Sequence, residues 1–131
     1  MSDITSQSLT SLVNNIKEKK LSSEEVTKAF VDRSEKSKEL NSYITEDFSN
    51  AIDKAKKFDE KPNFDLKLPG IPMAVKDLFC TKDIRTTAGS KILENFIPTY
   101  ESTVTQNIWN EGGILLGKLN CDEFAMGSSN E

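Results

Sequence analysis

The sequence predicts an α/β protein, in which a helical N-terminal portion is followed by the beginning of a mixed β-sheet covered by helices. Three observations support this. Residues 9–58 contain three stretches with apolar residues at helical spacing. Residues 68–78 and 114–118 are short apolar runs typical of strands, and a helical stretch ending in a glycine pair separates them. Strand, helix and strand in this order predict a βαβ-like unit with parallel strands.

The order of the elements also predicts two portions. We expect residues 1–60 to form an N-terminal helical portion with one short strand. Residues 61–131 are expected to form the first part of a larger domain, because two strands and one crossover do not complete a sheet. The polar stretch 59–67 is the expected linker between them.

The composition excludes several classes of function. The chain has 131 residues and a net charge of −4, so no overall positive field would draw it onto nucleic acid. It contains no histidine, which excludes Ser-His-Asp and Cys-His catalysis within this chain. Its two cysteines, Cys80 and Cys121, lack metal-site spacing, so we expect no metal site and two small buried residues.

The sequence also indicates a compartment. No apolar run approaches the length of a membrane span, and the N-terminus lacks the positive patch and apolar core of a signal peptide. We therefore expect a cytoplasmic protein with no membrane partner.

The first portion begins with a predicted helical hairpin. Residues 9–16 have an amphipathic pattern, and the lysines that follow suit the C-terminal end of a helix. Ser22 and Glu25 fit a capping box that starts a second helix directly afterwards. The short connection between the two stretches is typical of antiparallel helices.

A short strand and a third helix complete this portion. Residues 41–46 are rich in β-formers, and residues 48–58 again show helical spacing, with Asp47 as the expected cap. The other face of this helix is charged with both signs and predicts a solvent-exposed surface. Its residues are Asp53, Lys54, Lys56, Lys57, Asp59 and Glu60.

The stretch 68–78 carries the most informative pattern. Its Pro-Gly-Ile-Pro turn feeds an apolar run that contains Lys76. Alternation places Val75 and Asp77 on one face of the strand and Lys76 on the other. The spacing alone favours an edge strand, which often carries a lysine to block unwanted pairing.

The remaining elements follow in order. Residues 80–100 are predicted to form a loop with one short helical piece at 91–96. Ser102 is the expected cap of the next helix, which the glycine pair 112–113 ends. The apolar run 114–118 is the second strand, and the chain then turns polar.

Three segments together resemble the amidase signature family. They are Leu-Pro-Gly-Ile-Pro-Met-Ala-Val-Lys-Asp at 68–77, Thr-Ala-Gly-Ser-Lys-Ile-Leu-Glu-Asn-Phe at 87–96, and the stretch 116–131 with its Asp-Glu-Phe-Ala-Met-Gly-Ser-Ser motif. Within this family, the second and third segments look like the branch formed by the A subunits of aspartyl/glutamyl-tRNA amidotransferases. The resemblance implies a Ser-Ser-Lys hydrolytic triad in which Lys76 is the proton-accepting lysine. Such a lysine must be neutral, because an ammonium cannot act as a base.

The resemblance also bears on residues near this lysine. We interpret Asp77 as a structural acceptor that ties a neighbouring loop, not as a triad member. Met126, Gly127, Ser128 and Ser129 resemble the loop that lines the acyl pocket in the family. A turn with a left-handed glycine and locally bonded hydroxyls explains the same four residues equally well.

Both catalytic serines of the family lie in a later segment, so this chain is expected to be an N-terminal fragment that is inactive alone. The resemblance implies no cofactor in this chain, and ATP and Mg²⁺ used by the parent complex. It implies B and C subunits as partners in a heterotrimer, glutamine as the small-molecule substrate, and misacylated tRNA held through one of these partners.

Three possibilities remain open at this point. The chain belongs either to such an amidotransferase or to another amidase-signature hydrolase of small amides. A third possibility is a non-catalytic module that binds a partner through the helices at 9–30. The sequence leaves open whether tRNA(Gln), tRNA(Asn) or both are served.

Overall fold

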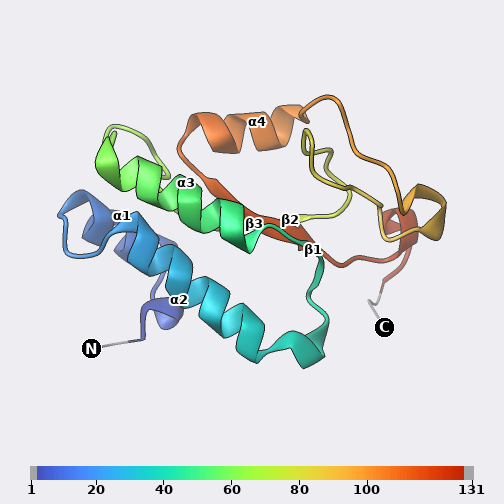
Figure 1. Ribbon diagram of the computed structural model, residues 1–131, viewed down its shortest axis with the longest axis horizontal. Coiled ribbons are helices and arrows are strands. Elements are labelled where there is room, and N and C mark those ends of the chain that lie inside the picture. Colours follow the sequence, from blue (N-terminus) through green and yellow to red (C-terminus); the bar gives the residue numbers. More distant parts are fainter. Residues whose placement is uncertain (1–2, 129–131) are drawn as a thin grey trace.

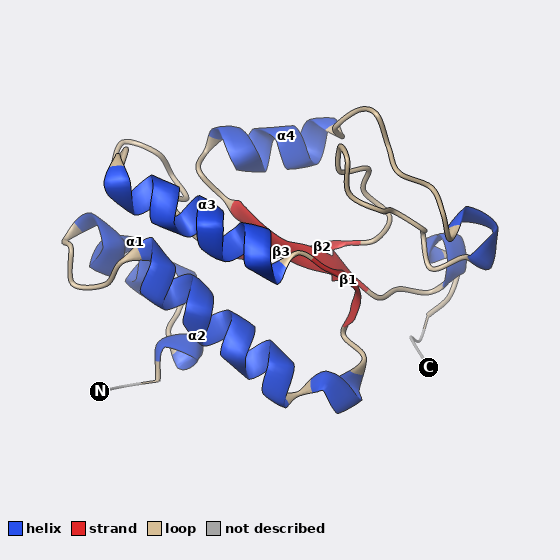
Figure 2. Cartoon of the chain, viewed as in Figure 1, coloured by secondary structure: helices blue, strands red, loops and turns tan. Residues whose placement is uncertain are grey.

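The computed structural model describes residues 3–128 and confirms the predicted α/β class. Short 3-10 turns connect some of the main elements, and Figures 1 and 2 show the arrangement. The elements are α1 (Leu9–Lys17), α2 (Ser23–Lys36), β1 (Tyr43–Glu46), α3 (Phe48–Glu60), β2 (Pro72–Lys76), α4 (Thr103–Asn110) and β3 (Ile114–Leu119). No helix in this part of the chain is long and apolar enough to cross a membrane.

The sheet is mixed, with strand order β1-β3-β2. β2 runs parallel to β3, with Val75 opposite Lys118 and Lys76 opposite Leu119. β1 runs antiparallel to β3 on its other side. Within residues 3–128, β2 therefore lies at the edge of the sheet.

Two apolar clusters join the helices to the sheet. One contains Val31 of α2, Ala51 and Ala55 of α3, and Ile114 and Leu116 of β3. The other joins α1 and α2 to the turn before β2, and its buried members are Leu12, Ile16, Val26 and Ile71. The helical N-terminal portion thus packs directly on the strands that follow it, and β1 belongs to the same sheet. The predicted boundary at residue 60 remains a prediction.

The helix starts follow local sequence signals. The Ser22 hydroxyl accepts a hydrogen bond from Glu25 N at 3.0 Å, and the Glu25 carboxylate accepts one from Ser22 N at 2.8 Å, so the capping box is confirmed. Ser102 likewise accepts from Thr105 N at 3.2 Å and caps α4. These bonds satisfy N–H groups that have no partner within the helix.

Three predictions in this part of the chain need correction. Asp47 stands at the cap of α3 but makes no capping bond, because its backbone (φ −127°, ψ 29°) is not extended. Asp59 does not simply face solvent: its carboxylate accepts from Ser23 N and Glu24 N at 2.9 Å each. It therefore stabilises the N-terminal end of α2. Cys121 is buried as expected, whereas Cys80 is only half-buried and its thiol donates to Tyr100 Oη at 3.4 Å.

The turn before β2 depends on a glycine. Gly70 has φ +67°, and a Cβ built on it would lie 2.5 Å from Ser23 Oγ. The Ser23 hydroxyl is fully buried and donates to Gly70 O at 2.6 Å. The close approach of α2 to this turn therefore leaves no room for a side chain.

Gly70→Ala is expected to lower the free energy of unfolding by more than the ~1–2 kcal/mol of a left-handed alanine, because the contact with Ser23 adds to that cost. Urea-induced unfolding measures the loss. The matched control is the stability difference between Asn41→Gly and Asn41→Ala, since residue 41 has φ +48° but is exposed. A loss in Gly70→Ala no larger than this difference would contradict the steric contribution.

Candidate active site

Lys76 is the last residue of β2, and its side chain is exposed. Its amine makes no hydrogen bond or ion pair with any other residue in 3–128. The apolar neighbours of Lys76 in the sequence do not enclose its side chain, because Leu78 is 41% exposed and Val75 is buried on the opposite face. No element of residues 3–128 covers the face of β2 on which Lys76 lies.

Asp77 is fully buried and points to the other side of the strand, as the alternation predicts. Its Oδ2 accepts hydrogen bonds from Thr87 N at 2.9 Å and from Thr87 Oγ1 at 2.6 Å. Its backbone carbonyl accepts from Ala88 N at 2.9 Å. The interpretation of Asp77 as an acceptor that ties a neighbouring loop is therefore confirmed.

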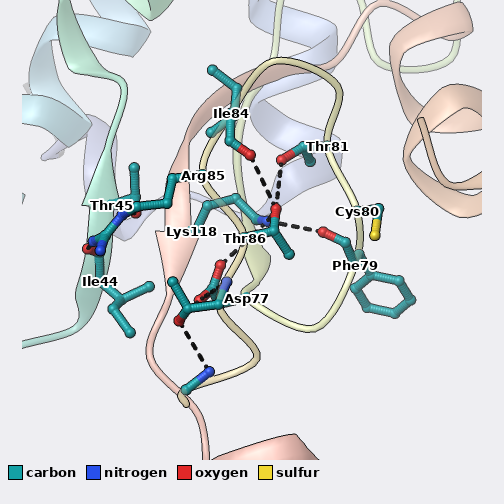
Figure 3. A network of polar contacts seen from close by, with 12 residues as sticks. Ile44, Thr45, Asp77, Phe79, Cys80, Thr81, Ile84, Arg85, Thr86 and Lys118 are labelled. Carbon is teal, nitrogen blue, oxygen red and sulfur yellow. Dashed lines mark hydrogen bonds and ion pairs between the residues drawn. The ribbon is translucent and has the colours of Figure 1, made fainter. Parts of the chain in front are cut away.

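Lys118 is the partner that sequence reasoning missed. It is fully buried, although it is a lysine in β3, and Figure 3 shows its side chain among Asp77, Phe79 and Thr86. Its Nζ donates to Thr86 Oγ1 at 2.6 Å and to Phe79 O at 2.8 Å, and lies 3.3 Å from Asp77 Oδ1. The sequence signal that could have indicated its burial is the position of this lysine inside the apolar run 114–119. The structure shows that the run forms a strand with neighbours on both sides.

Burial governs the electrostatics of this pair. Burial lowers the pKa of Lys118 below its ordinary value, and the negative charge of Asp77 opposes this shift. Both side chains are 0% exposed, so each charge depends on the other and on the surrounding oxygen and nitrogen atoms. The pair is therefore a buried structural unit at the end of β2, and one of its members, Asp77, directly follows the candidate base Lys76.

The loop at 86–90 connects this pair to the C-terminal segment. Ala88 and Gly89 have φ of +51° and +67°, which folds the loop back on itself. On the side away from Asp77, Ala88 O accepts from Phe124 N at 2.8 Å, and Ser90 Oγ donates to Glu123 Oε1 at 2.6 Å. One loop thus contacts both the end of β2 and the segment that leads to the predicted pocket residues.

The four predicted pocket residues are only partly described. Met126 is 81% exposed and Ser128 is exposed, whereas Ser129 lies outside the described residues. The left-handed turn is at Phe124 and Ala125, not at Gly127, so that part of the prediction is wrong. Gly127 lies close to Asp122: a Cβ there would lie 2.5 Å from Asp122 Cγ, so a larger residue would have to displace that side chain.

Residues 25–131 match the family model described as Amidase. The chain therefore belongs to the amidase family, as the sequence motifs indicate. It is 82% identical over all 131 residues to the A subunit of glutamyl-tRNA(Gln) amidotransferase from Pelagibacter ubique (strain HTCC1062), and covers 27% of that protein. It is 50% identical to the corresponding A subunit from Hyphomonas neptunium (strain ATCC 15444), again covering 27% of it.

A solved structure agrees with these relatives. An amidase family protein from Bacillus anthracis str. Ames superposes with a TM-score of 0.79 at 29% identity. The match covers 92% of this chain and 25% of that chain. The chain thus corresponds to the N-terminal part of its relatives and spans about a quarter of their length.

Proposed function

We propose that this chain is part of a glutamine-hydrolysing amidotransferase A subunit, which supplies ammonia for the ATP-dependent transamidation of misacylated tRNA. The observation that carries the proposal is the 82% identity, over the whole chain, to the A subunit of a glutamyl-tRNA(Gln) amidotransferase. The remaining part of the protein would supply the groups that these residues lack.

Lys76 is the proton acceptor in this proposal. As a neutral amine it takes a proton from a bridging serine, which in turn activates the nucleophilic serine for attack on the glutamine carboxamide. Both serines come from the part of the enzyme beyond Glu131. Two features support the assignment: the exposed position of Lys76 leaves it accessible to them, and the end of a strand holds its backbone in place. The 131 residues alone would be inactive.

The pocket loop is assigned in the same way. Met126, Gly127, Ser128 and Ser129 would line the acyl pocket, as the family resemblance implies. The exposure of Met126 and Ser128 supports this, because pocket residues must be reachable by the substrate.

The other components of the reaction belong to partners. Among the described residues, no cluster of acidic or cysteine side chains is arranged to hold a metal ion. The net charge of −4 also provides no general attraction for RNA. Because the family resemblance implies these components, we assign ATP, Mg²⁺ and the misacylated tRNA to the B and C subunits of a cytoplasmic heterotrimer, with the tRNA bound through one of these partners.

The test compares substrates with the complete subunit, expressed with its B- and C-type partners. We expect glutamate release from glutamine, together with formation of Gln-tRNA(Gln) when ATP and Glu-tRNA(Gln) are present. Asp-tRNA(Asn) is assayed in parallel. The 131-residue chain serves as the inactive control.

A different result would favour the hydrolase alternative. If the complete subunit purifies without partners and hydrolyses propionamide as efficiently as glutamine, the amidotransferase proposal is contradicted. If neither amide is hydrolysed and the partners still copurify through residues 9–30, the interaction module becomes the better explanation.

A further inference from the structure

Within the described residues, buried polar groups hold the end of β2 on its inward side. Within residues 3–128, β2 has a neighbouring strand only in β3, so its backbone lacks the second ladder that a central strand would have. Asp77 N donates to Leu119 O at 2.9 Å, which is the last bond between β2 and β3. Beyond this point the chain is held by two further backbone bonds, from Phe79 N to Lys76 O at 3.1 Å and from Ala88 N to Asp77 O at 2.9 Å. It is also held by the side chains of Asp77, Lys118 and Thr87, which are all buried.

We propose that Asp77, Lys118 and Thr87 form a positioning network that fixes the direction of the Lys76 side chain for proton transfer. This inference rests on the proposed function, because it assigns these residues to the site in which Lys76 acts. None of the three is expected to touch substrate; they act through Lys76.

The first argument is the alternation of side chains along the strand. Lys76 and Asp77 are consecutive, so their side chains leave opposite faces of the same short backbone segment. Anchoring Asp77 inward therefore sets the Cα–Cβ direction of Lys76 outward. Phe79 N donates to Lys76 O at 3.1 Å, which limits rotation of the same peptide from the other side.

The second argument is the origin of the anchoring groups. Lys118 comes from β3, opposite Val75, and reaches across the end of β2 to bond Thr86 and Phe79 (Figure 3). Thr87 comes from the returning loop and gives Asp77 Oδ2 both its N–H and its hydroxyl. The strand end is thus fixed to two separate parts of the chain.

The third argument concerns the chemistry. A general base must lie within hydrogen-bond reach of the proton it accepts, and a misplacement of about 1 Å can cost about 10²-fold in rate. The Lys76 side chain is long and flexible. Which of its conformations bring the amine within reach of the proton therefore depends on the position and orientation of its Cα–Cβ bond. Glutamine binding relies on other groups, and a loosened network should therefore reduce kcat and leave KM nearly unchanged.

The decisive pair of variants is Thr87→Val and Thr87→Ser in the complete subunit with its partners. Valine has nearly the shape of threonine but removes the hydroxyl bond to Asp77, whereas serine keeps it. We expect Thr87→Val to lower kcat for glutamate release by about 10-fold or more, with KM changed less than about threefold. Thr87→Ser is expected to stay within about twofold of the wild type.

Two further variants sharpen the test. Asp77→Asn keeps the size of the side chain but removes its charge, and should lower kcat in the same way as Thr87→Val. Ser34→Ala is the control, because it removes a hydroxyl that donates to Phe30 O within α2 and bonds none of the network residues. Circular dichroism and thermal unfolding ensure that only folded protein is compared.

Three results would overturn the positioning role. The first is a wild-type kcat in both Thr87→Val and Asp77→Asn. The second is a rise in KM at constant kcat, which would assign the network to substrate binding. The third is an equal loss in Thr87→Ser, which would make shape the cause instead of the hydrogen bond.

Failure of the proposed function has its own signature. A wild-type enzyme without glutaminase activity, or a Lys76→Met variant that retains it, would overturn both proposals together. Activity that depends on Lys76 but is indifferent to Thr87 and Asp77 would overturn the positioning network alone.

Discussion

Lys76→Met in the complete subunit is expected to lower kcat for glutamine hydrolysis by about 10²–10⁴-fold, the range that general-base catalysis typically contributes. Methionine keeps the unbranched apolar stem but removes the amine, so no proton acceptor remains at the end of β2. The loss should appear in kcat and kcat/KM alike, because the proton is transferred only in the reaction step. Steady-state assays of glutamate release measure both constants.

Lys76→Arg tests which property of the lysine matters. Arginine keeps a positive charge but cannot be deprotonated in a protein, so we expect it to be as inactive as methionine. Lys57→Met is the control, since Lys57 is an exposed lysine on the solvent face of α3. Substantial activity in Lys76→Arg would show that Lys76 acts through its charge and not as a base. Circular dichroism of both variants ensures that only folded protein is compared.

Lys118→Met is expected to lower the free energy of unfolding by about 3–5 kcal/mol, the cost of removing one partner from a buried ion pair. The substitution would leave the Asp77 charge buried without its counter-ion, and would deprive Phe79 O and Thr86 Oγ1 of their donor. Urea-induced unfolding of the complete subunit measures the loss.

A double variant separates the charge from the packing. Adding Asp77→Asn to Lys118→Met removes the stranded charge and still offers Thr87 an acceptor, so part of the lost stability should return. The control is Lys28→Met, which breaks the exposed ion pair with Glu24 (2.7 Å) and should leave the unfolding midpoint unchanged. A single variant as stable as the wild type, or a double variant less stable than Lys118→Met, would contradict this account.

Much of the fold could be predicted because its signals are local. The capping box at Ser22 and Glu25, the helical spacing of 9–16, and the glycine pair after α4 each depend on residues close together in the chain. The mixed sheet followed from the order of elements, since a crossover helix between two strands favours parallel pairing. The family resemblance, now confirmed, likewise rests on contiguous motifs.

The sequence by itself therefore determined the elements, the parallel pairing of β2 with β3, and the family. Only the tertiary structure decided the partners of three residues. Asp59 binds the start of α2, Lys118 is buried against Asp77, and Gly127 lies against Asp122. Charge and spacing do not reveal such partners, because a lysine or an aspartate is stable in the interior only when distant residues supply its hydrogen bonds. Those donors and acceptors meet only once the chain has folded.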